Sequence, residues 1–459
     1  MRLPAKIVPV ILGYVATVSA FFVLDNLPEI IRGHQSLSRL NAASILYQKA
    51  VTFGSRKPRN NYVALVLLDD NVPEAIKNNY CLQRKYLANV ISRIRDGRPA
   101  IIALDFVFGL GTCPDATDVY HGTAELRSAI ADVSKTIQIV IAEKTLDASS
   151  LEELPEKLAV LRGSGFKDTE VIIEPSDKFD STDTKVSYGL YTLNEDSRKI
   201  PLSWSAYRSL ASVGHEKPSM TDTFPVAVAD AYLPDPRVLL EIHKFQDKGR
   251  DPLTSFLTES DIRCFSSSDI LGNSTQPYVD SKKKCHSTDA HPVLAQLEHR
   301  VVVIGKDAPD LDRHDSIVGV VPGAVLQANY IESILDSRFL KPVQGWLSFS
   351  VALAWLALIE IIFRISTGHP HRALGLAILA TVVVWVLLYD LVVMQWGYYL
   401  VLWPPSLIAI LWRYVLVVSE PRTHTQVAPA QAQPRPTAAI QNQVPIEGSA
   451  PTMQKEAPR

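Results

Sequence analysis

The sequence carries little charge, and that charge has no basic bias. Among 459 residues there are 46 Lys or Arg and 48 Asp or Glu, so the formal net charge at pH 7 is −2. Proteins that bind nucleic acid usually gather Lys and Arg on one face. The composition therefore indicates no nucleic-acid partner.

Motifs that bind nucleotides or metals are also lacking. The segment Gly109–Thr112 follows a predicted strand, but it has neither the third glycine of the dinucleotide fingerprint nor a Walker lysine. Gly305 and Lys306 lack the rest of a phosphate loop and are interpreted as the end of a strand. The histidines between the apolar runs show no HExxH spacing: His286, His291, His299 and His314. We predict neither a cofactor nor a metal site.

Cysteine is scarce, and all four cysteines lie between the first and second apolar runs: Cys81, Cys113, Cys264 and Cys285. An even number confined to one segment suits an oxidising compartment. A Cys264–Cys285 disulfide would close a polar loop, which leaves Cys81 and Cys113 as the other pair. The alternative is four reduced, buried thiols, because connectivity cannot be read from a sequence.

Long apolar runs are present, and they divide the chain. The run 7–24 fits either an uncleaved anchor or a cleavable signal peptide, and its length favours the anchor. Three more runs approach the ~20 residues of a spanning helix: 346–363, 373–394 and 398–418. We expect residues 1–24 to form a cytoplasmic N-terminus and a first transmembrane helix, and residues 25–345 to form a separate domain.

The positive-inside rule orients these segments. Positive or titratable residues occupy the link after the second run, whereas the next link has none: Arg364, His369, His371 and Arg372. This pattern places both termini in the cytoplasm and the domain outside it. We expect a multi-pass protein of a bacterial inner membrane, in contact with the lipid bilayer. Its tail, residues 421–459, should be disordered.

Two ionisable residues within these runs fall at a similar depth, Glu360 in the second run and Arg413 in the fourth. Charged groups inside a membrane usually pair or face the interior of a bundle. We therefore hypothesise an intramembrane ion pair between Glu360 and Arg413. Snorkelling of each side chain toward the interface is the alternative.

Between the first two runs, apolar segments of strand length alternate with helical patterns. The predicted strands are 62–68, 100–108, 137–142 and 301–304, and the predicted helices are 85–95, 124–133 and 326–335. Strands that are apolar on both faces and alternate with amphipathic helices are typical of a covered parallel sheet. The expected fold class is α/β: a largely parallel, doubly wound sheet in an extracytoplasmic domain, plus four transmembrane α-helices.

Several short blocks in this segment carry a family resemblance. In order they are Val63–Asp70, Ala103–Phe108, Arg198–Leu202, Cys264–Leu271 (strand-like) and Val301–Asn329. Together they resemble the CHASE2 domain, an extracytoplasmic sensory module of bacterial receptors, over residues 36–345. One helix before and three after the domain is the usual CHASE2 arrangement. Two features depart from the pattern: Gln327 stands where such domains often have His, and 212–250 should be an insertion or divergent lobe.

Carboxylates follow two of the predicted strands. Asp69 and Asp70 come after the first strand, and Asp105 lies near the end of the second. Ligands of open α/β sheets bind outside the carboxyl ends of the strands, near a switch in strand order. These side chains are candidates for binding a cation or a basic ligand. Alternatively, they cap helices and order loops.

The resemblance implies a sensor, and the tail is too short for an output enzyme. We expect a non-enzymatic input protein that detects an unknown extracytoplasmic ligand and acts through a membrane or cytoplasmic effector protein. The chain could also form homo-oligomers, a question that the sequence leaves open. The alternatives are a structural or assembly subunit of a bacterial envelope complex, and an extracytoplasmic enzyme that uses Asp69 and Asp105.

Overall fold

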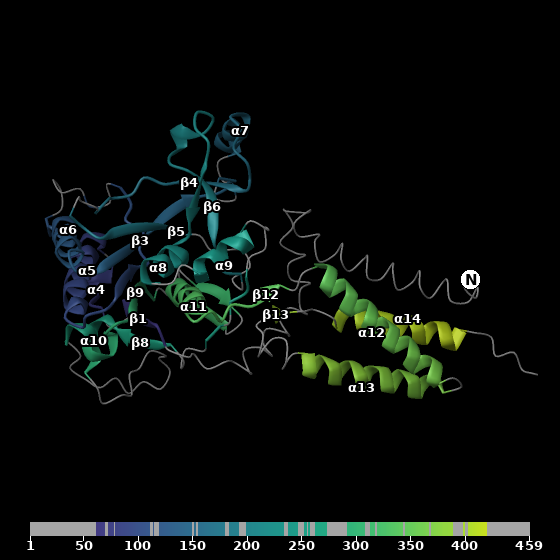
Figure 1. Cartoon of the computed structure of the whole chain (residues 1–459). Helices are drawn as coiled ribbons and strands as arrows, with labels where there is room; N and C mark the ends of the chain where they lie inside the picture. Colours follow the sequence, from purple (N-terminus) through teal and green to yellow (C-terminus); the bar gives the residue numbers. More distant parts are fainter. Residues whose placement is uncertain are drawn as a thin grey trace, which may run out of the picture.

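The computed structural model describes residues 61–419 with several gaps, of which the longest are 192–198, 273–291 and 389–397. Within that part, a large sheet with helices on both faces is followed by three further helices (Figure 1). The predicted helix at 7–24 and the predicted tail at 421–459 lie outside the described residues.

Six parallel strands form the centre of the sheet. In sheet order they are β5 (Val186–Tyr191), β3 (Gln138–Leu146), β2 (Ile101–Leu104), β9 (Val301–Lys306), β1 (Val63–Leu68) and β8 (Arg263–Ser266). Strand β9 comes last of these in the chain, yet it lies between β1 and β2. Its residue Val303 is paired with both Leu65 and Ala103.

Alternate residues of these strands enter two apolar cores, one on each face of the sheet. On the first face, Ala64 and Val66 of β1 belong to the core under three helices: α5 (Tyr80–Arg95), α6 (Gly122–Val133) and α10 (Ser267–Leu271). On the second face, Val63 and Leu65 belong to the core under three others: α8 (Phe224–Tyr232), α9 (Arg237–Gln246) and α11 (Gly323–Leu335). Every residue of α11 is buried.

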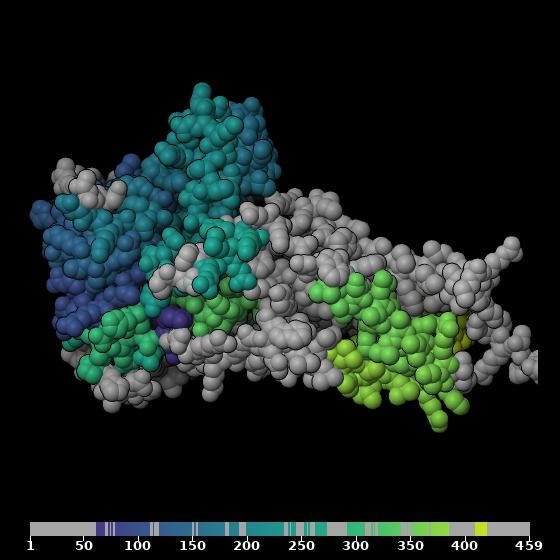
Figure 2. All heavy atoms as spheres, in the orientation of Figure 1, coloured from purple at the N-terminus to yellow at the C-terminus, as the bar shows by residue number. Residues whose placement is uncertain are grey.

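The expectation of a largely parallel sheet is wrong, because the sheet is mixed. Three more strands extend it: β4 (Glu170–Ile173), β6 (Ser203–Tyr207) and β7 (Ser219–Asp222). The pairs β3–β4 and β6–β7 are antiparallel. Strand β3 has nine residues, and its last two, Thr145 and Leu146, pair with β4 beyond the parallel core. These strands are short and partly polar, so apolar runs gave no signal for them. With α7 (Pro155–Gly163) they form a lobe that projects from the main body (Figures 1 and 2).

Shorter elements are found in the domain and between the later helices. They are the helices α4 (Glu74–Lys77), η1 (Leu210–Ser212) and η2 (Val293–Leu297), the antiparallel hairpin β10 (Arg313–Ser316) and β11 (Gly319–Pro322), and the paired strands β12 (Lys341–Pro342) and β13 (Tyr398–Tyr399).

Three helices follow the domain: α12 (Gly345–Ile365), α13 (Pro370–Leu388) and α14 (Trp403–Ser419). They overlap the predicted runs. However, none of the helices in the described part of the chain is both long enough and apolar enough to cross a membrane. The expectation of transmembrane helices there is therefore wrong. Helix α12 carries Glu360 and Arg364, and α14 has 17 residues, fewer than the ~20 of a typical span.

Candidate functional site

The carboxyl end of β9 lies at a switch in the direction of the chain connections. After β1 and after β2, the chain leads to α5 and α6, which cover the first face of the sheet. After β9, it leads through the β10–β11 hairpin to α11 on the second face. Open α/β sheets commonly bind ligands at the strand ends where adjacent connections depart to opposite faces.

Charged residues of both signs occupy this edge. Asp105 follows β2, and its backbone N–H donates to the carbonyl of Ile304 (2.8 Å). Lys306 ends β9, and the backbone N–H of Asp307 donates to Leu68 O (3.1 Å). The side chains of Asp105, Lys306 and Asp307 are half-buried. We call this group, together with Gly305, the carboxyl edge.

Of the three aspartates predicted to converge, only Asp105 is among the described residues; Asp69 and Asp70 lie outside them. Strand β9 separates β1 from β2, so the ends of β1 and β2 are two strand spacings apart, about 10 Å. Strand β9, which ends at Lys306, therefore lies between these two strand ends. The sequence predicts only a strand end at Gly305 and Lys306, because nothing in their own segment shows which strands flank it.

Gly305 allows α11 to approach this edge closely. A Cβ at residue 305 would lie 2.2 Å from Cβ of Ala324 in the first turn of α11 and 3.4 Å from Asp105 Oδ2. The first distance is far below van der Waals contact, so only glycine fits without movement of the helix. The first turn of α11 and the Asp105 carboxylate consequently lie around the same point.

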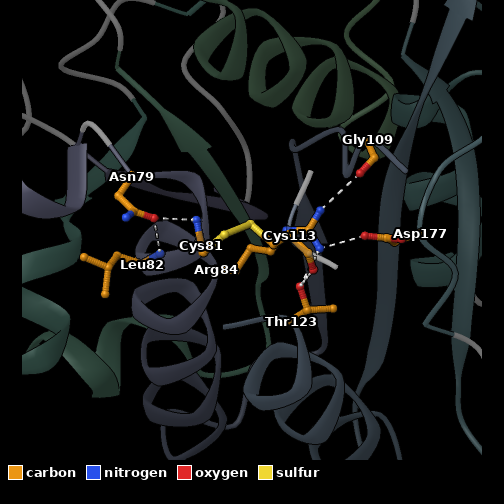
Figure 3. Close-up of a disulfide and its surroundings, with 8 residues drawn as sticks. All are labelled: Asn79, Cys81, Leu82, Arg84, Gly109, Cys113, Thr123 and Asp177. Atoms are coloured by element: carbon orange, nitrogen blue, oxygen red, sulfur yellow. Dashed lines mark hydrogen bonds and ion pairs between the residues drawn. A yellow bond between two sulfur atoms is a disulfide. The ribbon is translucent and has the colours of Figure 1, made fainter. Parts of the chain in front are cut away.

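A buried arginine holds the loop that follows Asp105 (Figure 3). The Arg84 side chain, 6% exposed, pairs with Asp177 at 2.7 Å. It also donates to Thr123 Oγ1 (2.9 Å) and to the carbonyl of Gly109 (3.3 Å). Its guanidinium lies 5.7 Å from the ring centroid of Phe108. One side chain thus ties α5, α6, the loop after β2 and the segment before β5 together.

The disulfide predicted between Cys81 and Cys113 is confirmed, with a Cα–Cα distance of 5.6 Å. It joins the first turn of α5 to the same loop (Figure 3). Thr123 Oγ1 donates to the carbonyl of Cys113 (2.8 Å), so the loop is fixed on both sides. Cys264 is also disulfide-bonded, and Cys285 lies outside the described residues.

A second charged group surrounds the far end of α11. Glu332, 2% exposed, accepts the backbone N–H groups of Tyr62 (3.1 Å) and Val63 (2.7 Å) at the start of β1. Burial raises the pKa of the Glu332 carboxyl, while these two N–H groups and the Arg338 charge act in the opposite direction. Arg338 Nε lies 2.6 Å from Asp336 Oδ2, and both side chains are 2% exposed. No apolar or helical pattern singles these residues out.

The structure brings Glu360 and Arg413 together. Arg413 Nε lies 2.8 Å from Glu360 Oε2, with both side chains more than four-fifths buried. Arg364, one turn along α12, also donates to Glu360 Oε1 (3.0 Å). The pair joins α12 to α14. Among the residues that are described, no three His, Cys, Asp or Glu side chains gather as metal ligands would.

Comparison with known proteins identifies a family. The chain matches the CHASE2 domain over residues 29–368, a range that includes the carboxyl edge, the Arg84 contacts and α11. No curated protein and no solved structure matches it. The matched range is more than half of the 459 residues, and it encloses the resemblance seen in the sequence blocks. The chain belongs to the CHASE2 domain family.

Proposed function

We propose that this protein is a sensory input module that binds a small ligand at the carboxyl edge and acts through a partner protein. The observation that carries the proposal is the position of α11. Its first turn packs on Gly305, and the chain after its last turn leads through β12 into α12. A ligand at the carboxyl edge would therefore touch the helix that continues toward the three-helix segment.

Family membership supports a sensor, because CHASE2 domains are extracytoplasmic sensor domains. The Cys81–Cys113 disulfide supports the same compartment, since disulfides persist outside the reducing cytoplasm. We infer that the α/β domain works in an extracytoplasmic, oxidising environment.

The connection from α11 to α12 offers a path for the signal. Leu340, just after α11, exchanges two backbone hydrogen bonds with Leu253 (3.0 and 2.7 Å). Glu332 fixes the last turns of α11 to the start of β1. Helix shifts of 1–2 Å are a common form of switching. A small shift at the first turn of α11 would have to be passed to these contacts, because the helix is buried along its length.

The exposed side chains of the three helices support action through a partner. Several large apolar residues there are well exposed, among them Ile365 (80%), Leu379 (59%) and Leu411 (57%). Large apolar side chains left exposed to solvent mark interaction sites where they form a patch. We propose that an effector protein binds there and that the protein itself catalyses no reaction.

Thermal shift of the full chain against amino acids, sugars, nucleotides, inorganic phosphate and divalent cations tests the proposal. One compound class should raise the melting temperature of the wild type and of the control Asp132→Asn, an exposed carboxylate on α6. The same class should not raise that of Asp105→Asn. If no class stabilises the wild type, sensing of a small ligand is contradicted and the assembly-subunit alternative gains. Chemical turnover of the stabilising compound would instead favour an enzyme.

A further inference from the structure

Helix α11 contains two buried amide side chains that differ in one respect. Both ends of the Asn329 amide are hydrogen-bonded: its Oδ1 accepts the backbone N–H of Leu257 (2.7 Å), and its Nδ2 donates to the carbonyl of Val325 (3.0 Å). Gln327 has 0% exposure, and neither Oε1 nor Nε2 has a hydrogen-bond partner within the described part of the chain. An unpaired buried amide destabilises a fold, so its presence calls for a reason.

From helix geometry, we infer that Gln327 leans toward the turn of α11 that lies at the carboxyl edge. Gln327 follows Ala324 by three residues, which places both on the same side of α11, about 4.5 Å apart along the axis. Helical side chains lean toward the N-terminus of their helix. The first turn of α11 is the turn that packs on Gly305, so Gln327 leans back toward that turn.

Two further groups lie near the first turn of α11, and each favours a ligand group of one sign of charge. The Asp105 carboxylate is close to the first turn of α11, because both surround the point that a Cβ at Gly305 would occupy. Helix α11 has 13 residues, and its N-cap, Pro322, provides no side-chain cap. The N-terminus of a helix favours a negative group through its N–H donors and its dipole. A carboxylate favours a positive one.

We propose that Gln327, Asp105 and the first turn of α11 form a recognition site for a small zwitterion, such as a free α-amino acid. The ligand's carboxylate would accept hydrogen bonds from the first turn of α11 and from Gln327 Nε2. Its ammonium group would donate to Asp105 and to Gln327 Oε1. This inference rests on the proposed function, since it names the ligand class and a recognition residue for the same edge.

Ligands with one sign of charge fit this arrangement less well. An isolated phosphate would be favoured by the helix N-terminus but repelled by Asp105. A lone metal cation would be favoured by Asp105 but repelled by the helix dipole. An amide that both donates and accepts is suited to a ligand whose two charged groups are bonded to the same carbon atom.

Isothermal titration of the full chain with each standard α-amino acid tests the inference, with inorganic phosphate and Ca²⁺ as comparison probes. At least one amino acid should bind, and Gln327→Met should weaken its binding at least about tenfold. Without ligand, Gln327→Met should melt at a higher temperature than the wild type, because it removes an unpaired buried amide. The matched variant Asn329→Leu should melt at a lower temperature, because it leaves the Leu257 N–H unpaired.

Four results would overturn the inference, and they distinguish its failure from the failure of the proposed function. If an amino acid binds wild type and Gln327→Met equally, Gln327 is not a recognition residue. If only phosphate, Ca²⁺ or another class binds and that binding requires Asp105, the proposed function stands and the zwitterion is wrong. If no compound of any class binds, both fail. A lower melting temperature for Gln327→Met would show that its amide is paired, which also refutes the inference.

Discussion

Replacing both Cys81 and Cys113 with alanine should lower the stability of the α/β domain by an amount that the chain length predicts. The disulfide closes a loop across a sequence separation of 32. Loop-closure entropy of the unfolded chain then corresponds to about 3.7 kcal/mol at room temperature. The folded loop should keep its place without the disulfide, because Arg84 and Thr123 still hold Gly109 and Cys113 through their carbonyls.

Arg84→Met provides a comparison that acts on the folded state. It leaves Asp177, 11% exposed, without its ion pair, and breaking a buried pair of this kind typically costs about 3–5 kcal/mol. Because one change acts on the unfolded chain and the other on the folded one, their effects should add to within about 0.5 kcal/mol in the triple variant.

Urea unfolding of the full chain, followed by circular dichroism in the absence of reductant, measures each free energy of unfolding. The reasoning is refuted if the alanine pair costs less than about 1 kcal/mol, since loop entropy alone predicts more. It is also refuted if Arg84→Met costs much less in the background without the disulfide. That result would mean that the disulfide positions the folded loop and that Arg84 depends on it.

Three other predictions concern individual contacts. Gly305→Ala should lower the free energy of unfolding by about 1–3 kcal/mol, because its Cβ would lie 2.2 Å from a side-chain atom of α11. The control Gly375→Ala should not lower it, because a Cβ there would have nothing within 4 Å. Equal effects of the two in urea unfolding would refute the packing argument. Burial is the main cause that raises the pKa of Glu332, so the folded state favours its neutral form. The stability that this carboxyl contributes is therefore fully present below the ordinary glutamate pKa. It is lost as the pH rises through the raised pKa of the folded state. The stability of the wild type relative to Glu332→Gln should therefore decline with rising pH in urea titrations, and a constant difference would contradict this. Glu360→Lys and Arg413→Glu should each lower the melting temperature of the three-helix segment, and the double variant should recover part of the loss; a double variant worse than either would contradict the ion pair.

The central strands could be predicted from the sequence, because their apolar character is local. The predicted runs 62–68, 137–142 and 301–304 correspond to β1, β3 and β9. The strand expected at 264–271 ends at Ser266 instead, because Ser266 Oγ accepts the backbone N–H of Ser268 (3.2 Å) and caps α10. A strand order that inserts β9 between β1 and β2 is set by long-range pairing, and no local pattern records it.

The candidate site was only partly predictable for the same reason. Asp105 was found because it follows an apolar run. The Arg84–Asp177 contact spans 93 residues, and nothing in the sequence of α5 distinguishes Arg84, which is buried, from Arg93 and Arg95. Gln327 was noted only as a departure from the family pattern. Gln327 draws attention only because its amide has no hydrogen-bond partner among the described residues. That can be recognised only when the surroundings of the whole helix are known.

The late position of β9 has a consequence for biosynthesis. Both neighbours of β1 in the sheet, β8 and β9, lie about two hundred residues or more after it in the chain. Until residues 301–306 have been synthesised, β1 and β2 expose unpaired strand edges, which favour aggregation. The domain should therefore fold late and slowly, and it should depend on chaperones to keep its first half apart from other nascent chains. A fragment that ends before residue 301 should be recovered as an aggregate.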